Sequence, residues 1–219
     1  MMDHNSLFSR TVYCTSRRTL QLVGVMGFGL RRSGLNNIPV EGGALVLSNH
    51  QSHFDPPLLG LSCPRPMGFL ARQTLFGTRL MDFLMSVHGA FPIDREGSGL
   101  AGIKETLRRL KRGEMVVIFP EGTRTRDGEI APFRAGFTAL ARRGKVPILP
   151  VAIEGAHGVW PRGRAYPGPG TIQIHFGPIL PTDEIARLDD SQLIAESERR
   201  VRECHAVLRR RPVFAKSDS

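Results

Sequence analysis

Short, continuous apolar runs alternate with longer amphipathic stretches through the middle of the chain. Such runs predict strands buried on both faces of a sheet, at residues 44–48, 67–70, 89–93 and 115–119. Apolar positions with a helical period predict the intervening helices, at residues 57–62, 75–87, 98–112 and 134–143. Strands that alternate with helices are typical of α/β domains. We therefore expect a mixed, mostly parallel sheet flanked by helices.

Two further strands are predicted near the C-terminal end. Residues 146–153 include Pro147 and Pro150, and because proline cannot donate to a ladder we expect an edge strand or a bulged one. Residues 171–176 alternate between polar and apolar positions, which predicts a half-buried strand with His175 on the polar side, toward solvent.

Helix boundaries follow from the capping residues. Ser98 suits the start of one predicted helix, and Gly144 suits the end of another. Thr182 opens a short helix, and Asp190 then caps a long amphipathic one.

The N-terminal part differs from the rest. Residues 17–32 form an almost wholly apolar stretch bracketed by arginine pairs, which favours a short helix at the interface of an anionic membrane. A helix packed on the domain is the alternative. The apolar run is much shorter than the roughly 20 residues that a membrane span needs. We expect a tail and interface helix over 1–40, a core over 41–181, and C-terminal helices packed on it over 182–219.

Composition limits the class of protein further. The 219 residues are 41% hydrophobic and 23% charged, as in a globular protein, but the formal net charge is +10. This charge predicts attraction to an anionic membrane, a nucleic acid or an acidic carrier. Cys14, Cys63 and Cys204 are too few and too widely spaced for a disulfide framework or a thiolate zinc site.

The strongest chemical signal is the stretch Asn49-His50-Gln51-Ser52-His53-Phe54-Asp55, directly after a predicted strand. In a continuous helix, side chains five positions apart diverge by about 140°. Pro56 and Pro57 delay the start of the helix, so His50 and Asp55 lie in a turn where they can meet. A carboxylate that orients an imidazole makes a general base. In the alternative, Asp55 only caps the helix and His50 is an ordinary loop histidine.

The same stretch imitates a metal site, with His50 and His53 followed by Asp55. Two histidines and a carboxylate are a known ligand set. The remaining histidines lack ligand spacing, and such triplets often arise by chance. We therefore predict no metal.

Two later loops bring arginines to strand ends. Arg95 follows the strand at 89–93, and Arg124 follows Phe119-Pro120-Glu121-Gly122-Thr123 after the strand at 115–119. Ligands bind at the carboxyl ends of strands in α/β sheets, and a guanidinium suits a phosphate. Surface salt bridges are the alternative for each arginine taken alone.

Four segments in this order resemble known motifs: NHQSHFD, GAFPIDR, FPEGTR and VPILPVAI. Together they resemble the glycerolipid acyltransferases, specifically the lysophosphatidic acid acyltransferase type, over residues 42–181. Two positions depart from the common pattern, Pro92 in place of an aromatic residue and Arg72 in place of lysine. The resemblance implies a mixed sheet flanked by helices, preceded in the sequence by an N-terminal helical piece that sits on the bilayer.

The resemblance also implies roles for particular residues. The catalytic pair falls on His50 and Asp55. The acceptor-phosphate residues fall on Arg95, Glu121, Gly122, Thr123 and Arg124. The fourth motif, linked to the acyl donor, includes Pro147 and Pro150. For Glu121 the residues leave open a second role, in which its carboxylate holds an arginine in place.

The expected reaction is direct acyl transfer from acyl-CoA or acyl-carrier protein to a lysophospholipid hydroxyl, with no cofactor, no metal and no nucleic-acid partner. The preferred acceptor is 1-acyl-glycerol-3-phosphate, and another lysolipid or an amino-lipid is the alternative. The expected location is the cytoplasmic side of the cell membrane, as a peripheral or monotopic protein on an anionic surface. A rival of a different class is a non-catalytic basic protein that binds membrane or nucleic acid by charge alone.

Overall fold

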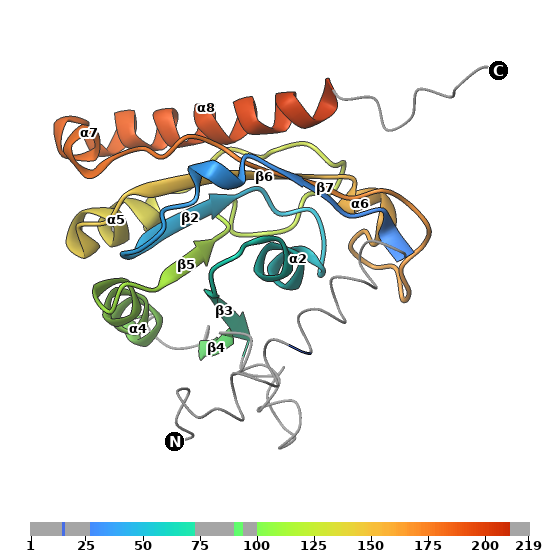
Figure 1. Ribbon diagram of the computed structural model, residues 1–219, viewed down its shortest axis with the longest axis horizontal. Coiled ribbons are helices and arrows are strands. Elements are labelled where there is room, and N and C mark those ends of the chain that lie inside the picture. Colours follow the sequence, from blue (N-terminus) through green and yellow to red (C-terminus); the bar gives the residue numbers. More distant parts are fainter. Residues whose placement is uncertain (1–14, 16–26, 73–89, 94–99, 211–219) are drawn as a thin grey trace.

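A seven-stranded sheet forms the centre of the protein (Figure 1). The computed structural model describes residue 15 and residues 27–72, 90–93 and 100–210. Along the sheet the strands follow the order β1-β7-β6-β2-β5-β3-β4, and every neighbouring pair is parallel except β6 with β7. The bounds are β1 Arg31–Ser33, β2 Ala44–Ser48, β3 Met67–Arg72, β4 Ala90–Ile93, β5 Met115–Ile118, β6 Ile148–Glu154 and β7 Gln173–Phe176. The expected mixed, mostly parallel sheet is confirmed.

Helices cover both faces of the sheet. They are α2 Asp55–Ser62, α4 Leu100–Lys111, α5 Thr138–Gly144, α6 Ala156–Val159, α7 Thr182–Arg187 and α8 Asp190–Arg209, with 3₁₀ turns η1 Leu35–Asn37 and η3 Ala135–Phe137. Figure 1 shows α8 lying along one face, with α2 on the other. Side chains of β2 alternate between two cores: Val46 packs with Leu59 of α2, and Leu45 packs with Phe137 and Leu193 from the opposite layer.

The strand with two prolines is not an edge strand, and this part of the prediction is wrong. β6 lies between β7 and β2. Pro150 has no N–H to donate, and on its β7 side the pairing is irregular. There the Gly177 N–H donates to the Pro150 carbonyl at 2.8 Å. The pairing shifts by one residue between Ile148↔Leu180 and Val151↔Phe176. This shift is a bulge opposite Pro150, as the second half of the expectation had it.

The predicted N-terminal helix is wrong at its C-terminal end. Arg31–Ser33 is strand β1, which pairs with β7 and so belongs to the sheet. It follows Gly29, which has a φ of 50° and breaks the helical path. Residues 17–26, the predicted helix at 75–87 and the cap at Ser98 lie outside the described residues. Within the described part of the chain, no helix has the length and apolar character to cross a membrane.

Two smaller expectations are corrected near the C-terminal end, and a third is confirmed. Helix α5 ends at Gly144, as expected, and Lys145 after it takes the left-handed conformation, with a φ of 51°. The cap of α8 is Asp189, whose carboxylate accepts from Gln192 N–H at 2.8 Å. His175 does not face open solvent, because β1 lies beside β7 and Ser33 Oγ is 2.9 Å from its Nδ1.

Gly155 gives a stability test for the junction between β6 and α6. It has a φ of +88°, and a Cβ there would lie 2.1 Å from the Thr171 carbonyl oxygen. We expect Gly155→Ala to lower the free energy of unfolding by about 2 kcal/mol or more, since the left-handed region alone costs an L-residue about 1–2 kcal/mol. For a chain of this size this is a fall in Tm of roughly 4–8 °C.

The matched control for this test is Gly158→Ala, three residues along in α6. A Cβ at Gly158 meets nothing within 4 Å, and alanine is the better helix former. We expect the control to leave Tm unchanged or slightly higher. Equal losses in both variants would contradict the assignment of strain to Gly155. Thermal unfolding followed by circular dichroism measures both.

Candidate active site

The histidine turn, residues 49–55, begins where β2 ends. Its first residue joins it to the neighbouring strand, because the Asn49 amide donates to the Ile153 carbonyl at 2.9 Å and accepts from Ile153 N–H at 2.8 Å. The Asn49 side chain thus makes the pair of hydrogen bonds that a backbone residue of a neighbouring strand would make. They hold the backbone in place as it leaves the sheet toward His50.

His50 and Asp55 meet across the turn, as the sequence predicts. Nδ1 of His50 is 2.8 Å from Oδ2 of Asp55. The carboxylate is fully buried, whereas the imidazole keeps 19% of its side-chain surface exposed. Among the described residues, no hydrogen bond engages the other ring nitrogen, Nε2. The pair therefore combines a buried carboxylate with an imidazole that solvent can reach.

Asp55 does not act as a simple helix cap. It is the first residue of α2, and Pro56 and Pro57 occupy the next positions. Its Oδ2 accepts from the backbone N–H of Gln51 at 2.5 Å and of Ser52 at 2.8 Å, both of which precede the helix. The carboxylate therefore closes the turn back on itself and fixes the histidine at the same time.

Glu121 braces the same turn from the next loop. One carboxylate oxygen accepts from His50 N–H at 2.7 Å and the other from Ala131 N–H at 2.8 Å. The His50 carbonyl in turn accepts from Thr125 N–H at 2.8 Å. Both backbone groups of the histidine are thus held by residues 121–131. The contacts of Glu121 are those of a brace, and its assignment to the acceptor phosphate stays a prediction.

Phe119 fixes the plane of the imidazole. The two rings stack with centroids 4.0 Å apart and planes 18° apart. Since the Asp55 bond directs Nδ1 and the stack prevents the ring from turning edge-on, the direction of Nε2 is defined. Such a preformed orientation is what a general base needs.

The pKa values of Asp55 and Glu121 are both raised. Burial raises the pKa of Asp55, while the His50 side chain and the N–H groups of Ser52 and Gln51 oppose this rise. Burial also raises the pKa of Glu121, against the N–H groups of Ala131 and His50. The remaining oxygen of Asp55, Oδ1, is buried with no hydrogen-bond partner in the described part of the chain.

The loop after β5 brings the other predicted residues to this edge of the sheet. Gly122 has a φ of 73°, which allows its N–H to reach the Phe119 carbonyl at 3.0 Å. Gly122 and Thr123 are exposed and Arg124 is half-buried. This loop contacts the histidine turn through Glu121 and Thr125, so the structure brings these residues together with His50.

The remaining predicted site residues are Arg95, Pro147 and Pro150. Arg95 lies outside the described residues; β4, which precedes it, ends at the same edge as β2 because the intervening strands are parallel. Pro147 precedes β6 at the opposite edge, six residues or about 20 Å from the level of Ile153. Pro150 is buried in the middle of β6. The assignment of the two prolines to the acyl donor stays a prediction.

Sequence reasoning gave no role to Gln51, which joins three segments. Its amide donates to the Gly128 carbonyl at 3.2 Å and accepts from His157 N–H at 3.2 Å. The side chain is only 2% exposed. The available signal was a run of polar residues directly after a buried strand, since a buried polar group needs such partners.

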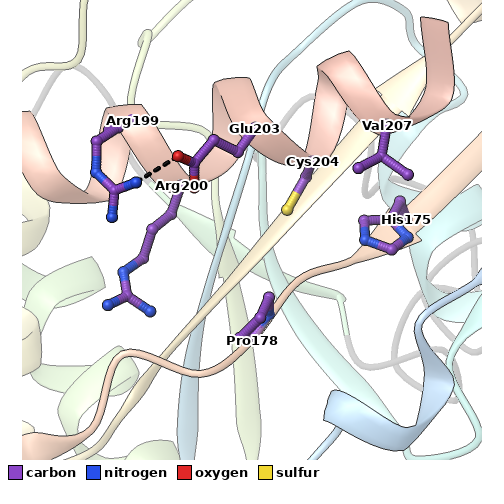
Figure 2. A pocket seen from close by; sticks show the side chains of 7 residues that line it. All are labelled: His175, Pro178, Arg199, Arg200, Glu203, Cys204 and Val207. Carbon is purple, nitrogen blue, oxygen red and sulfur yellow. Dashed lines mark hydrogen bonds and ion pairs between the residues drawn. The ribbon is translucent and has the colours of Figure 1, made fainter. Parts of the chain in front are cut away.

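The described part of the protein contains two hollows of note. One, of about 510 Å³, is lined by Arg126, His157, Pro161, Arg162 and Gly163. The other, of about 200 Å³, lies beneath α8 (Figure 2) and is lined by His175, Pro178, Arg199, Arg200, Glu203, Cys204 and Val207. In the second hollow Arg199 pairs with Glu203, and Arg200 pairs with Glu184 outside it. No residue of the histidine turn lines either hollow.

No group of three or more potential metal ligands occurs among the described residues. His53 is exposed, and its ring lies 5.6 Å from that of Trp160.

The chain is similar to known acyltransferases. The sequence model of the Acyltransferase family matches residues 29–154. A 1-acyl-sn-glycerol-3-phosphate acyltransferase of Bacillus subtilis is 30% identical over 186 residues, which cover 84% of this chain and 90% of that protein. One of Pseudomonas aeruginosa is 34% identical over 160 residues, 71% of this chain and 61% of that protein.

A solved structure shares the fold. The 1-acyl-sn-glycerophosphate (LPA) acyltransferase PlsC of Thermotoga maritima superposes with a TM-score of 0.77. The match covers 99% of this chain and 86% of that one, at 22% sequence identity. At this identity the likeness shows the fold alone.

The raised pKa of Asp55 predicts a gain in stability when its charge is removed. Below the ordinary aspartate pKa the group is protonated in both states and contributes nothing. Between that pKa and the raised native pKa the unfolded state loses its proton first, so the free energy of unfolding falls as the pH rises, and above the native pKa the loss is complete. We expect Asp55→Asn to raise Tm at neutral pH, and the difference to vanish in acid.

The control is Asp183→Asn, whose side chain is 67% exposed. It should change the free energy of unfolding by no more than about 0.5 kcal/mol, as surface substitutions do. Thermal unfolding across the pH range provides the measurement. A lower Tm for Asp55→Asn at every pH would show that the hydrogen bonds to the carboxylate outweigh its burial.

Proposed function

The chain belongs to the Acyltransferase family, and on this premise we propose that it acylates the free hydroxyl of 1-acyl-sn-glycerol-3-phosphate to give phosphatidic acid. The acyl donor is a thioester, either acyl-CoA or acyl-carrier protein. The names of the relatives support the acceptor. The observation that carries the proposal is the 2.8 Å contact of His50 Nδ1 with the buried Asp55, which leaves Nε2 accessible.

The proton positions follow from this contact. A carboxylate oxygen that already receives two backbone N–H groups accepts a third hydrogen, so the ring carries its proton on Nδ1. Nε2 then presents a lone pair. In the proposed reaction it takes the proton of the acceptor hydroxyl as that oxygen bonds to the thioester carbon.

The rest of the transfer returns the proton. The tetrahedral intermediate collapses, the carbon–sulfur bond breaks, and the thiolate leaves with the proton that Nε2 carried. Asp55 stabilises the imidazolium while it exists. No residue of the protein needs to form a covalent intermediate, and Ser52 is not free for this role because its Oγ donates to the Trp160 carbonyl at 2.8 Å.

Arg124 is the described candidate for the acceptor phosphate. It lies in the loop that Glu121 and Thr125 join to His50. A guanidinium there would hold the phosphate while the nearby hydroxyl faces Nε2. Arg95, Gly122 and Thr123 complete the acceptor site in this proposal. We place the enzyme at the cytoplasmic face of an anionic membrane, as a peripheral or monotopic protein.

Replacing the proposed base gives the direct test of this function. We expect His50→Ala to lower kcat about 10²- to 10⁴-fold, the usual contribution of a general base. The control is His53→Ala, which removes an exposed histidine three residues away and should keep near-normal kcat. Acyl transfer is followed with palmitoyl-CoA and lysophosphatidic acid. Wild-type turnover in His50→Ala would refute the assigned base.

The assignment of Arg124 predicts a selective effect on the acceptor. Loss of a charged hydrogen bond, worth about 1.5–3 kcal/mol, should make Arg124→Ala raise the acceptor KM roughly 10- to 100-fold and leave the donor KM nearly unchanged. Arg124→Lys should recover part of the loss. Arg143→Ala, an exposed arginine in α5, is the charge-matched control. Equal increases in both KM values would contradict a phosphate-binding role.

A further inference from the structure

A basic loop, residues 161–170, follows α6 and carries charge of one sign. The sequence contains no acidic residue between Glu154 and Asp183. Arg162 and Arg164 are exposed, and no described carboxylate forms an ion pair with either. Tyr166 is 80% exposed, although a tyrosine ring is largely apolar.

The basic loop has a definite shape. Gly168 N–H donates to the Val159 carbonyl at 2.8 Å, which closes the base of the loop. The Trp160 indole N–H donates to the Arg164 carbonyl at 2.8 Å. These bonds hold the backbone while the side chains of Arg162 and Tyr166 point outward. Packing of the protein therefore does not account for these exposed residues.

Trp160, the residue directly before the basic loop, attaches it to the histidine turn. Ser52 Oγ donates to the Trp160 carbonyl at 2.8 Å. The rings of Phe54 and Trp160 pack edge to face with centroids 4.5 Å apart. Ser52 and Phe54 lie two and four positions after His50, so the basic loop is joined to the same turn as His50.

The N-terminal apolar segment enters the fold at the same place. The ring of Phe28 lies 5.4 Å from that of Phe54, and the Phe28 carbonyl accepts from Ile172 N–H at 3.0 Å. Residues 20–30 form the longest apolar stretch of the sequence. Its end and the basic loop thus flank one side of the histidine turn.

The charge around the basic loop is positive on balance. Arg126, His157 and Arg162 line the hollow of about 510 Å³ at its base. Asp127 is the acidic residue beside His157, and hydrogen bonds from Glu129 N–H and Thr125 Oγ1 lower its pKa and keep it charged. The arginines at positions 126, 162 and 164 thus outnumber this carboxylate. An anionic partner is attracted to this side.

We propose that the basic loop is a membrane-contact surface that inserts Tyr166 among the head groups of anionic phospholipids, with Arg162 and Arg164 at their phosphates. The inference rests on the proposed function, in which the acceptor is a membrane lipid. An arginine near an anionic bilayer is attracted to it, and tyrosine is enriched at the lipid–water interface. The bound loop then holds the histidine turn close to the bilayer.

The lipid surface is favoured over an acidic carrier protein by the apolar partners of the loop. The arginines alone would attract an acidic carrier protein as well. The exposed ring of Tyr166 and the adjacent entry of the apolar N-terminal segment at Phe28 add hydrophobic contacts that a bilayer accommodates.

The test compares vesicle binding of the full chain and of the combined variant Arg162→Ala, Arg164→Ala and Tyr166→Ser. Co-sedimentation uses vesicles of phosphatidylcholine with phosphatidylglycerol, and vesicles of phosphatidylcholine alone. Because the three side chains are exposed, the variant should fold normally. We expect its partition coefficient on the anionic vesicles to fall about tenfold or more. Turnover of a short-chain, monomeric acceptor should stay unchanged.

The matched control removes the same charge and one exposed apolar side chain elsewhere: Arg143→Ala, Arg187→Ala and Val40→Ser. Val40 is 92% exposed, and the two arginines belong to α5 and α7, which Figure 1 shows at the end opposite α6. We expect less than a twofold change in the partition coefficient of the control.

Several outcomes would overturn the proposal. Unchanged binding in the loop variant would do so, as would an equal loss in the control, which would indicate net charge alone. A raised KM for acyl-carrier protein with normal vesicle binding would identify the loop as a carrier-protein site instead. Vesicle binding needs no turnover, so a wild-type protein that binds but transfers no acyl group would contradict only the proposed function.

Discussion

The proposed chemistry depends on one buried carboxylate. Asp55 Oδ2 receives the His50 ring and two backbone N–H groups at 2.5–2.8 Å. A single charge therefore shapes the turn, selects the ring nitrogen that carries the proton, and supports the imidazolium during transfer. The cost is burial, which raises the pKa of this carboxyl. Stability and catalysis make opposite demands on the same group, as is common at functional sites.

Every neighbouring element restricts the histidine further. Glu121 and Thr125 hold its backbone, Phe119 stacks on its ring, and Asn49 ties the end of β2 to β6. These residues come from three strand ends at one edge of a mostly parallel sheet. The fold thus brings together residues far apart in the sequence without strain at His50 itself. The same edge carries the basic loop, so acceptor, base and proposed membrane surface share one side.

Hydrophobic patterns predicted the described core strands well, because a strand buried on both faces leaves a continuous apolar run. The expectation of an edge strand failed for β6, because a proline is tolerated inside a sheet when its missing N–H faces a bulge. The position of a strand within a sheet also depends on its partners, which its own sequence does not reveal. The helix prediction failed at Arg31–Ser33 because an arginine pair after an apolar stretch suits the basic end of a helix as well as an edge strand. His50 and Asp55 were found since proline fixes the local turn; the bracing role of Glu121 depends on a contact 71 residues away.

The tautomer of His50 tests the central interaction most directly. Nitrogen-15 NMR of the full chain with labelled histidine distinguishes the two ring nitrogens, and Asp55→Asn assigns the signal by its shift. The account predicts that the neutral ring of His50 carries its proton on Nδ1, with a proton resonance displaced downfield by the carboxylate. A neutral ring protonated on Nε2 would leave no lone pair facing the acceptor and would contradict the mechanism.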